Sequence, residues 1–162
     1  ETDVDDYRTF FKVKPPLRSE DDRTSVVEAV RTGTIDIISS MHTPQDEESK
    51  RLPFEEAASG AVGLETLICA AIGLYHRDEL DLNTLFRAMA FNPARRLGLD
   101  CGRLAKGAPA DLVLFDPDAS FILDRTQLKS RSKNTPFDGV EMRGKVLKTL
   151  VAGKIVFEAE NA

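Results

Sequence analysis

Residues 39–66, SSMHTPQDEESKRLPFEEAASGAVGLET, decide how the rest of the chain is interpreted. The stretch follows a short apolar run, Ile35–Ile38, and returns to a regular pattern near Gly60. Between these points lie His42, two prolines and a group of acidic residues. A long polar loop between a strand and a helix is where α/β proteins place their binding and catalytic groups. Function is therefore sought first in this stretch.

The residues before this stretch predict a strand, a helix and a second strand. Tyr7–Val13 is rich in aromatic residues and ends at two prolines, which lack the amide donor that a ladder needs. Ser19–Asp22 supplies a capping residue and acids for a helix that ends near Gly33. Ile35–Ile38 has the composition of a strand covered on both faces. This order predicts a βαβ unit of a parallel sheet.

Helices are predicted on the far side of the stretch. From Val62 to His76 the apolar residues recur at the spacing of one buried helical face. A second helix is expected to begin after Asp81, and its predicted buried residues are Leu85, Met89 and Ala90. The third, Ala94–Leu97, follows a proline and is capped by Gly98.

After Gly102 the pattern changes to short β runs. These runs are Leu112–Phe115, Val140–Met142, Lys145–Val151 and Ile155–Phe157, with a hairpin turn at Gly153 and Lys154. We therefore expect two domains, over residues 1–100 and 101–162.

Composition argues against several classes of function. A net charge of -5 and the lack of a dense basic run give no support for a nucleic-acid partner, and no apolar run is long enough for a membrane span. We interpret Lys129–Lys133, the most basic patch, as a solvated loop. Cys69 and Cys101 are too few for a disulfide framework, which favours the reducing cytoplasm. The chain opens at Glu1 without an initiator Met, as expected of a fragment.

Five blocks together resemble the last part of a dihydroorotase, a cyclic amidohydrolase of the amidohydrolase superfamily. They are KVKPPLRSEDDR, GTIDIISSMHTPQDEESKRLPFEEAASGAVGLET, FNPARRLGL, GRLAKGAPADLVLFDP and GKVLKTLVAGKIVFE. The resemblance implies an α/β fold: the last two βα units of a (β/α)8 barrel, followed by the C-terminal strands of a small β-sandwich. The segment ADLVLFD by itself is also similar to dihydropyrimidinases and allantoinases, which remain alternatives.

The resemblance also implies zinc, which makes a water molecule nucleophilic, and a carboxylate that moves its proton. The family's main metal ligands, an HxH pair, a carboxylated Lys and two later His, would all precede Glu1, so none is expected here. The family's acid belongs to a loop written roughly D-H-A-P-H. Aligned on His42 and Pro44, this chain has Met41 at the acid position and Gln45 at the second His position. A one-residue slip of the loop, or recruitment of Asp46, would be needed to restore a carboxylate.

Substrate contacts carried over from the family fall on five positions. Lys14 stands where an Asn is usual, His42 and Gln45 lie in the altered loop, and Ser59 and Gly60 would contribute main-chain groups. Each has a structural alternative: His42 as a solvated side chain, Ser59 as a helix cap and Gly60 as a turn glycine.

Two functions follow from the resemblance. In one, the complete protein interconverts dihydroorotate and N-carbamoyl-aspartate in pyrimidine synthesis, and this fragment is inactive alone. In the other, it is a non-catalytic relative that assembles with itself or with aspartate transcarbamoylase, which the altered Met41 position favours. Because two of eight barrel strands would leave open edges, we expect the fragment to associate or to need a partner.

Overall fold

The computed structural model describes residues 2–159, which form two compact units that interleave along the chain. Unit 1 gathers the described residues of 1–26, 39–68 and 122–141. Unit 2 gathers those of 27–38, 69–121 and 142–162. The predicted boundary near residue 100 concerns the domains of a complete protein, and it stays a prediction.

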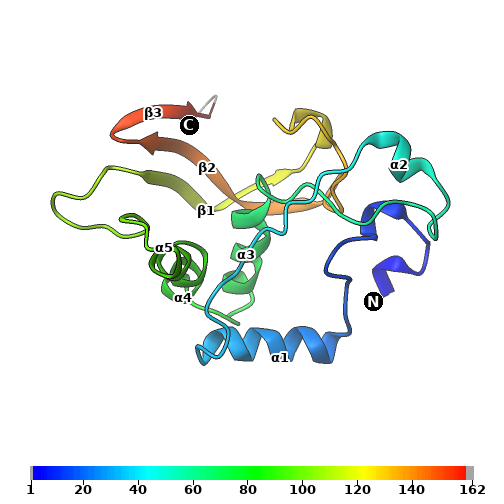
Figure 1. The fold of residues 1–162 in the computed structure, drawn as a ribbon, viewed down its shortest axis with the longest axis horizontal. Helices are drawn as coiled ribbons and strands as arrows, with labels where there is room; N and C mark the ends of the chain where they lie inside the picture. The colour runs from blue at the N-terminus through cyan, green and yellow to red at the C-terminus, as the bar shows by residue number, and fades with distance from the viewer. Residues whose placement is uncertain (1, 160–162) are drawn as a thin grey trace. The chain divides into compact units, whose positions relative to one another are not determined.

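The chain is an α/β structure with mostly short helices and one antiparallel sheet (Figure 1). The α-helices are α1 (Glu20–Arg31), α2 (Glu47–Arg51), α3 (Leu67–His76), α4 (Leu82–Phe86) and α5 (Asn92–Leu97). The strands are β1 (Leu112–Ile122), β2 (Glu141–Val151) and β3 (Lys154–Glu158). The 3-10 turns are η1 (Thr2–Val4), η2 (Thr9–Phe11) and η4 (Arg125–Gln127), and η3 (Arg87–Phe91) is a π-helical turn.

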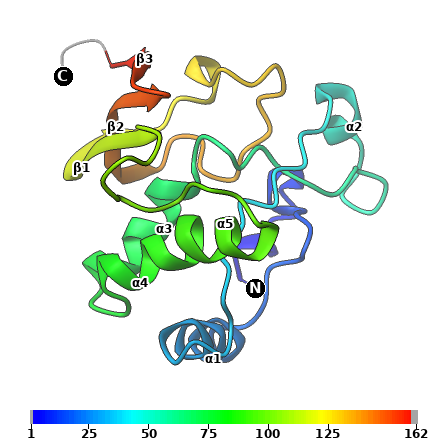
Figure 2. The ribbon, with the colours of Figure 1, turned by 60° about the vertical axis from the view of Figure 1, so that its left-hand side comes forward.

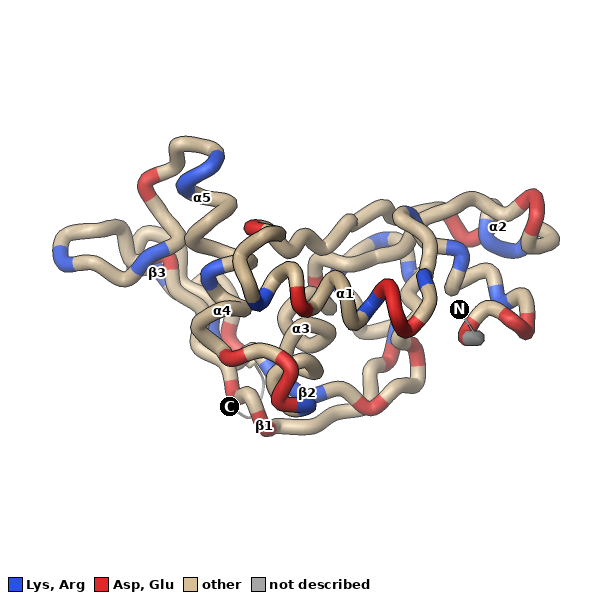
Figure 3. Tube along the Cα trace, turned by 90° about the horizontal axis from the view of Figure 1, so that it is seen from below, with Lys and Arg blue, Asp and Glu red and all other residues tan. Residues whose placement is uncertain are grey.

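Helix α1 begins where the sequence predicts. The Ser19 hydroxyl accepts a hydrogen bond from the Asp22 amide at 3.2 Å, and the Asp22 carboxylate accepts from the Ser19 amide at 3.4 Å. This reciprocal pair is a capping box, which satisfies donors that the first turn leaves open. Three acidic residues occupy that turn (Figure 3), where they oppose the positive end of the helix dipole.

The predicted strand Tyr7–Val13 is wrong. Its centre is the 3-10 turn η2, in which the Lys12 amide donates to the Thr9 carbonyl at 3.0 Å. The Lys50 ammonium also donates to the carbonyls of Thr9 and Lys12, at 3.0 Å each. The Lys12 carbonyl also accepts from the Gly60 amide, so both carbonyls are paired without a neighbouring strand.

The predicted strand Ile35–Ile38 is wrong as well. The Ile38 amide donates to the carbonyl of Ala88, at 3.0 Å, and the Asp36 carbonyl accepts from the Asn92 side chain at 2.9 Å. A strand needs a ladder of backbone partners, and this segment instead bonds to a helical segment. Among the described residues, it has no strand beside it.

Among the helices after residue 60, α3 differs from the prediction at its start, whereas the start of α4 and the end of α5 are as predicted. Helix α3 begins at Leu67 rather than at Val62, although its end at His76 is as expected. Helix α4 starts after Asp81, whose carboxylate caps it by accepting from the Thr84 amide at 2.9 Å. Helix α5 ends at Gly98 in the left-handed conformation, as predicted.

Helices α4 and α5 form one continuous rod through the π turn η3 (Figure 2). Leu85 is fully buried and Met89 half-buried, as the helical spacing predicts. Ala90 is exposed, so its predicted burial is wrong, and Ala88 is buried instead. In an α-helix Ala88 lies about 60° around the axis from Leu85 and Ala90 about 140° from it, so the regular helical spacing itself places Ala88 on the buried face.

Unit 2 has a core formed by α3, the α4–η3 rod and the end of α1. Its buried members are Val30, Ala71, Leu80, Leu85 and Ala88, and the partly buried residues against them are Val27, Ile38, Leu74, Tyr75 and Met89. Val27 and Val30 of α1 and Ala71 and Leu74 of α3 therefore pack as their helical spacing predicts, whereas Val26 and Leu64 are exposed.

The sheet has the order β1-β2-β3, and β2 pairs antiparallel with β3. Ala152 and Gly153 form the hairpin turn with positive φ at both positions, as a two-residue primed turn requires. The hairpin prediction is confirmed, with Lys154 already in β3. Two predicted runs, Val140–Met142 and Lys145–Val151, lie in one strand, β2.

Candidate functional site

Two segments of the 39–66 stretch meet in unit 1 through His42. The Thr43 amide donates to the Ala61 carbonyl at 2.8 Å, which aligns the two backbones. The His42 Nδ1 atom accepts from the amides of Gly63, at 3.1 Å, and Leu64, at 3.3 Å. An imidazole nitrogen that accepts is unprotonated, so in the neutral ring the proton lies on Nε2. His42 is therefore tied to the backbone on one side and offers a donor on the other.

Asn134 holds the same two segments from a third part of the chain. Its Oδ1 accepts from the Gln45 amide at 3.2 Å, and its Nδ2 donates to the Gly60 carbonyl at 3.0 Å. Its own carbonyl accepts from the Val62 amide at 2.8 Å. The side chain is only 3% exposed. Buried polar groups with several partners fix local geometry, because any displacement leaves some of them unpaired.

The sequence prediction missed Asn134 because it follows the basic stretch Lys129–Lys133. The composition of that stretch is typical of a solvated loop, and it does not distinguish the buried Asn that follows. Its neighbour Thr135 is also fully buried. The one signal in the sequence is that Asn134 begins an Asn-Thr-Pro segment, which is typical of a turn.

Gln45, Ser59 and Gly60, three of the predicted substrate contacts, lie next to one another. The Gln45 side-chain amide donates to the Ser59 carbonyl at 3.1 Å. The Gly60 amide donates to the Lys12 carbonyl at 2.9 Å, and Gly60 has φ +132. A Cβ at Gly60 would lie 2.5 Å from the Thr43 carbonyl oxygen, so the close approach requires glycine.

Met41 stands at the predicted acid position with positive φ, +45, and an exposed side chain. Its carbonyl accepts from the Thr43 hydroxyl at 2.9 Å. A thioether cannot take up a proton as a carboxylate does. The Asp46 carboxylate, the proposed replacement, caps α2 by accepting from the Ser49 amide at 2.7 Å. Recruiting Asp46 would give up this cap, which is worth about 1 kcal/mol.

Lys14 does not join the other predicted site residues. Its side chain is exposed, and within residues 2–159 no hydrogen bond or ion pair connects it to His42 or Gln45. Lys12, two residues earlier, is the lysine that contacts the stretch, since its ammonium donates to the carbonyls of Phe54 at 2.7 Å and Glu55 at 2.8 Å.

Lys50 is a buried lysine that the sequence prediction did not single out. It is 3% exposed, and its ammonium donates to two carbonyls of the η2 region. Burial, and secondarily the positive charge of Lys12, lower the pKa of Lys50. It fastens the start of the chain to the stretch.

The described residues do not fit a zinc site of their own. No group of three or more His, Cys, Asp or Glu side chains comes together among residues 2–159 in a way that could hold a metal ion. A tetrahedral zinc site needs three or four such ligands, and Met41 occupies the one position where the family loop would place an acid. Also within the described range, no helix is long and apolar enough to cross a membrane.

Known proteins resemble this chain over nearly its full length. Dihydroorotase from Desulforapulum autotrophicum is 44% identical over 157 residues, which cover 97% of this chain and 37% of the relative. Dihydroorotase from Geobacter metallireducens is 44% identical over 152 residues, covering 94% and 36%. The chain thus spans a little over a third of the length of these curated relatives.

Solved structures of related proteins share the fold of this chain over more than nine-tenths of its length. L-Hydantoinase (dihydropyrimidinase) from Arthrobacter aurescens superposes with a TM-score of 0.87 and 32% identity, over 97% of this chain and 36% of that one. D-Hydantoinase (dihydropyrimidinase) from Thermus sp. gives a TM-score of 0.83 at 26% identity, over 93% and 34%. Residues 12–156 match the family model described as the Amidohydrolase family. The chain therefore belongs to the amidohydrolase family.

Proposed function

We propose that this chain is the C-terminal part of a dihydroorotase-like cyclic amide hydrolase. The reaction adds water across the ring amide of dihydroorotate, breaks the C–N bond and gives N-carbamoyl-aspartate; the reverse reaction closes the ring. The observation that carries the proposal is the junction of the Met41–Gln45 loop with the Ser59–Leu64 segment, held by His42 and Asn134. Its support from relatives is the similarity to curated dihydroorotases. In the proposed complete protein, the chain supplies the last two βα units of the barrel and the C-terminal strands of the sandwich.

In this proposal the described residues bind and orient the substrate. The Nε2–H of His42 is free of the backbone contacts that occupy Nδ1, so it can donate to an anionic or carbonyl oxygen. Gln45 and Gly60 hold the backbone around that donor. Zinc, when bound by residues outside this chain, would supply the activated water of the family reaction. No residue of the Met41–Gln45 loop supplies the carboxylate that general base catalysis needs.

A second candidate is a non-catalytic relative that assembles with itself or with an aspartate transcarbamoylase. The specific observation in its favour is Met41, whose side chain cannot accept a proton, together with the use of the Gln45 amide in a bond to Ser59. In this candidate, Met41 and Gln45 contribute to the structure of the loop and do not contact a substrate.

A third candidate is a cyclic amidohydrolase of the dihydropyrimidinase or allantoinase type. The 32% identity with a solved L-hydantoinase (dihydropyrimidinase) favours it. The 44% identity with curated dihydroorotases is higher over a similar length of this chain, so we place the dihydroorotase first. Turnover of dihydroorotate, dihydrouracil and allantoin by one preparation distinguishes the three substrate types.

The test compares Met41→Asp with the unchanged complete protein, supplied with zinc, in hydrolysis of dihydroorotate. We expect the carboxylate to raise kcat by about 10²-fold or more, the size of a general acid–base contribution. Ser39→Asp is the control, because it adds a carboxylate to the same exposed loop two residues away. The 162-residue chain alone should show no turnover.

Each other result has a clear meaning. Inactivity of both Met41→Asp and the unchanged protein would favour the non-catalytic candidate. Full activity of the unchanged protein, with no gain from Met41→Asp, would show that the acid comes from elsewhere and would overturn our account of the loop.

A further inference from the structure

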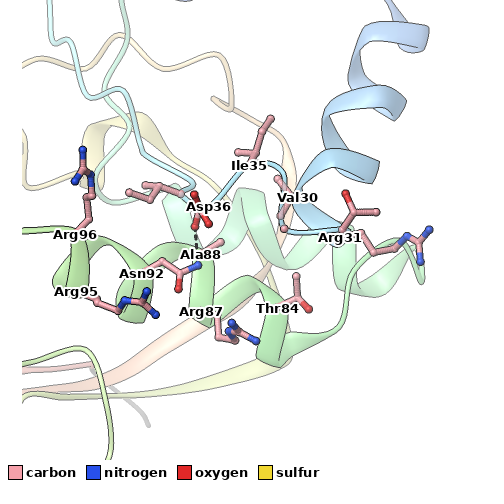
Figure 4. A pocket seen from close by; sticks show the side chains of 13 residues that line it. Val30, Arg31, Ile35, Asp36, Thr84, Arg87, Ala88, Asn92, Arg95 and Arg96 are labelled. Carbon is pink, nitrogen blue, oxygen red and sulfur yellow. Dashed lines mark hydrogen bonds between the residues drawn. The ribbon is translucent and has the colours of Figure 1, made fainter.

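Unit 2 contains a cavity of about 460 Å³, whose lining includes none of the residues of the candidate site. One wall comes from the end of α1 and the segment after it, and it includes Val30, Ile35 and Ile37 together with Arg31, Thr32, Gly33 and Asp36. The other wall consists of Arg87, Arg95 and neighbouring residues of the α4–α5 rod (Figure 4). We name this cavity the arginine pocket. Its volume is within the range of about 300–1,000 Å³ that small-molecule sites occupy.

Three arginines of this pocket have no charged partner within the part of the chain that the structure describes. Arg87, Arg95 and Arg96 line it, and within residues 2–159 none of the three takes part in an ion pair or side-chain hydrogen bond. Arg31, also in the lining, is paired with Glu28 at 2.7 Å. The single lining carboxylate is that of Asp36. Positive charge is therefore concentrated here in a chain whose net charge is -5.

The π turn η3 brings Arg87 and Arg95 onto one face of the rod. In a regular α-helix, residues eight apart are offset by about 80° around the axis. In η3 the Asn92 amide donates to the Arg87 carbonyl, five residues back, so the turn holds one extra residue. That residue takes up about 100° of rotation and leaves an offset of about 20° between the two arginines. Such turns are rare and frequently occur at functional sites.

The wall opposite the arginines of the rod combines apolar side chains with the polar side chains of Thr32 and Asp36. Val30 is buried, whereas Ile35 and Ile37 remain 36% and 38% exposed. A ligand that combines an anionic group with a nonpolar body would contact both walls. The Asn92 side chain donates to the backbone carbonyl of Asp36 and so holds this residue in the lining. The negative charge of the Asp36 carboxylate would repel a second anionic group of a ligand. A ligand with one charged end therefore fits better than a polyanion such as nucleic acid.

We propose that the arginine pocket binds a small organic phosphate. The phosphate group is held by Arg87 and Arg95, because guanidinium groups form paired hydrogen bonds with phosphate oxygens. The nonpolar body of the ligand lies against Ile35 and Ile37. This site is independent of the proposed hydrolase activity, since it shares no residue with the Met41–Gln45 loop.

The test uses phenyl phosphate and inorganic phosphate as probes, titrated calorimetrically into the complete protein and into the 162-residue chain. We expect one site per chain, with phenyl phosphate bound about tenfold more tightly because its ring covers the apolar side chains of the opposite wall. Arg87→Ala and Arg95→Ala should each weaken binding at least tenfold, since each removes a charge-assisted hydrogen bond. Arg51→Ala is the matched control: Arg51 is exposed, pairs with Glu47 and lies in unit 1.

Several outcomes would overturn the proposal. One is an equal loss of affinity in Arg51→Ala, which would mean that only net charge matters. Another is the absence of saturable binding, and a third is binding by the short chain but not by the complete protein, which would mean that other parts of the protein cover the pocket. If an alanine variant is unfolded by circular dichroism, Arg87→Lys and Arg95→Lys decide, because they keep the charge and lose the paired geometry. Unchanged affinity in both lysine variants would also contradict the proposal.

Discussion

The Nδ1 atom of His42 accepts a hydrogen bond from the amide of Gly63 at 3.1 Å. The two residues are 21 positions apart, and the bond joins the loop that carries Met41, at the predicted acid position, to the segment that leads into α3. An isolated His in a polar loop is usually solvated, yet here it is a backbone acceptor. The consequences can be measured as stability.

Replacing His42 should separate the two segments. His42→Ala removes the acceptor of the Gly63 and Leu64 amides, and we expect it to lower the free energy of unfolding by about 1–2 kcal/mol. In His42→Asn the Oδ1 atom can take the place of Nδ1, so this variant should recover at least half of the loss. Urea unfolding of the complete protein measures both. Equal stability of the Ala and Asn variants would contradict the acceptor role.

Asn134→Ala should be the more damaging change. It leaves the Gln45 amide and the Gly60 carbonyl without their partner in a buried region, and unpaired buried groups cost about 1–3 kcal/mol each. We expect a loss of about 2–4 kcal/mol in the free energy of unfolding by urea. Asn83→Ala, at an exposed position of α4, is the control and should change stability by less than about 0.5 kcal/mol. Similar losses in the two variants would refute a special role for Asn134.

Gly60→Ala tests the close approach of the two segments. The added Cβ would lie 2.5 Å from the Thr43 carbonyl oxygen, so the backbone must move. Gly33→Ala is the matched control, because Gly33 also has positive φ, +77, but nothing lies within 4 Å of its added Cβ. We expect Gly33→Ala to cost about 1–2 kcal/mol from backbone conformation alone and Gly60→Ala to cost clearly more. If thermal and urea unfolding rank them in the opposite order, the junction is looser than described.

The buried Lys50 makes stability depend on pH in a definite direction. Because its pKa is lowered in the folded chain, the unfolded chain binds the proton more strongly. Stability should therefore rise with pH between the lowered folded-state pKa and the ordinary value of 10.5, and the penalty should be fully present below that window. Lys50→Met removes this dependence and also removes one of the two hydrogen-bond donors to each of the carbonyls of Thr9 and Lys12.

The measurement is urea unfolding at pH 8 and pH 10 for the unchanged protein, Lys50→Met and Lys106→Met. The unchanged protein should gain stability over Lys50→Met as the pH rises. Lys106→Met removes a charge at an exposed position and corrects for net charge. A gain that appears equally against Lys106→Met would not come from Lys50.

Short-range patterns predicted the parts of the fold that local hydrogen bonds form. Ser19 and Asp22 are three residues apart, and their capping box placed the start of α1. Asp81 likewise caps α4. The predicted site residues His42, Gln45 and Gly60 do lie together, although their roles with a substrate stay predictions.

Sequence by itself determined the features in which both partners lie within one turn: helix caps, the left-handed Gly98 and the presence of a hairpin turn at Gly153, although the turn lies one residue earlier than predicted. It also determined the amidohydrolase family membership, through blocks that run the length of the chain. Only the tertiary structure decided that Ile35–Ile38 bonds to a helical segment and that Asn134 joins two distant segments. It also aligned Arg87 with Arg95 through a π turn. The first two features depend on hydrogen bonds and packing between residues far apart in the chain, which composition and periodicity do not encode. The third depends on a helical hydrogen bond that spans five residues instead of four, which the apolar pattern does not encode either.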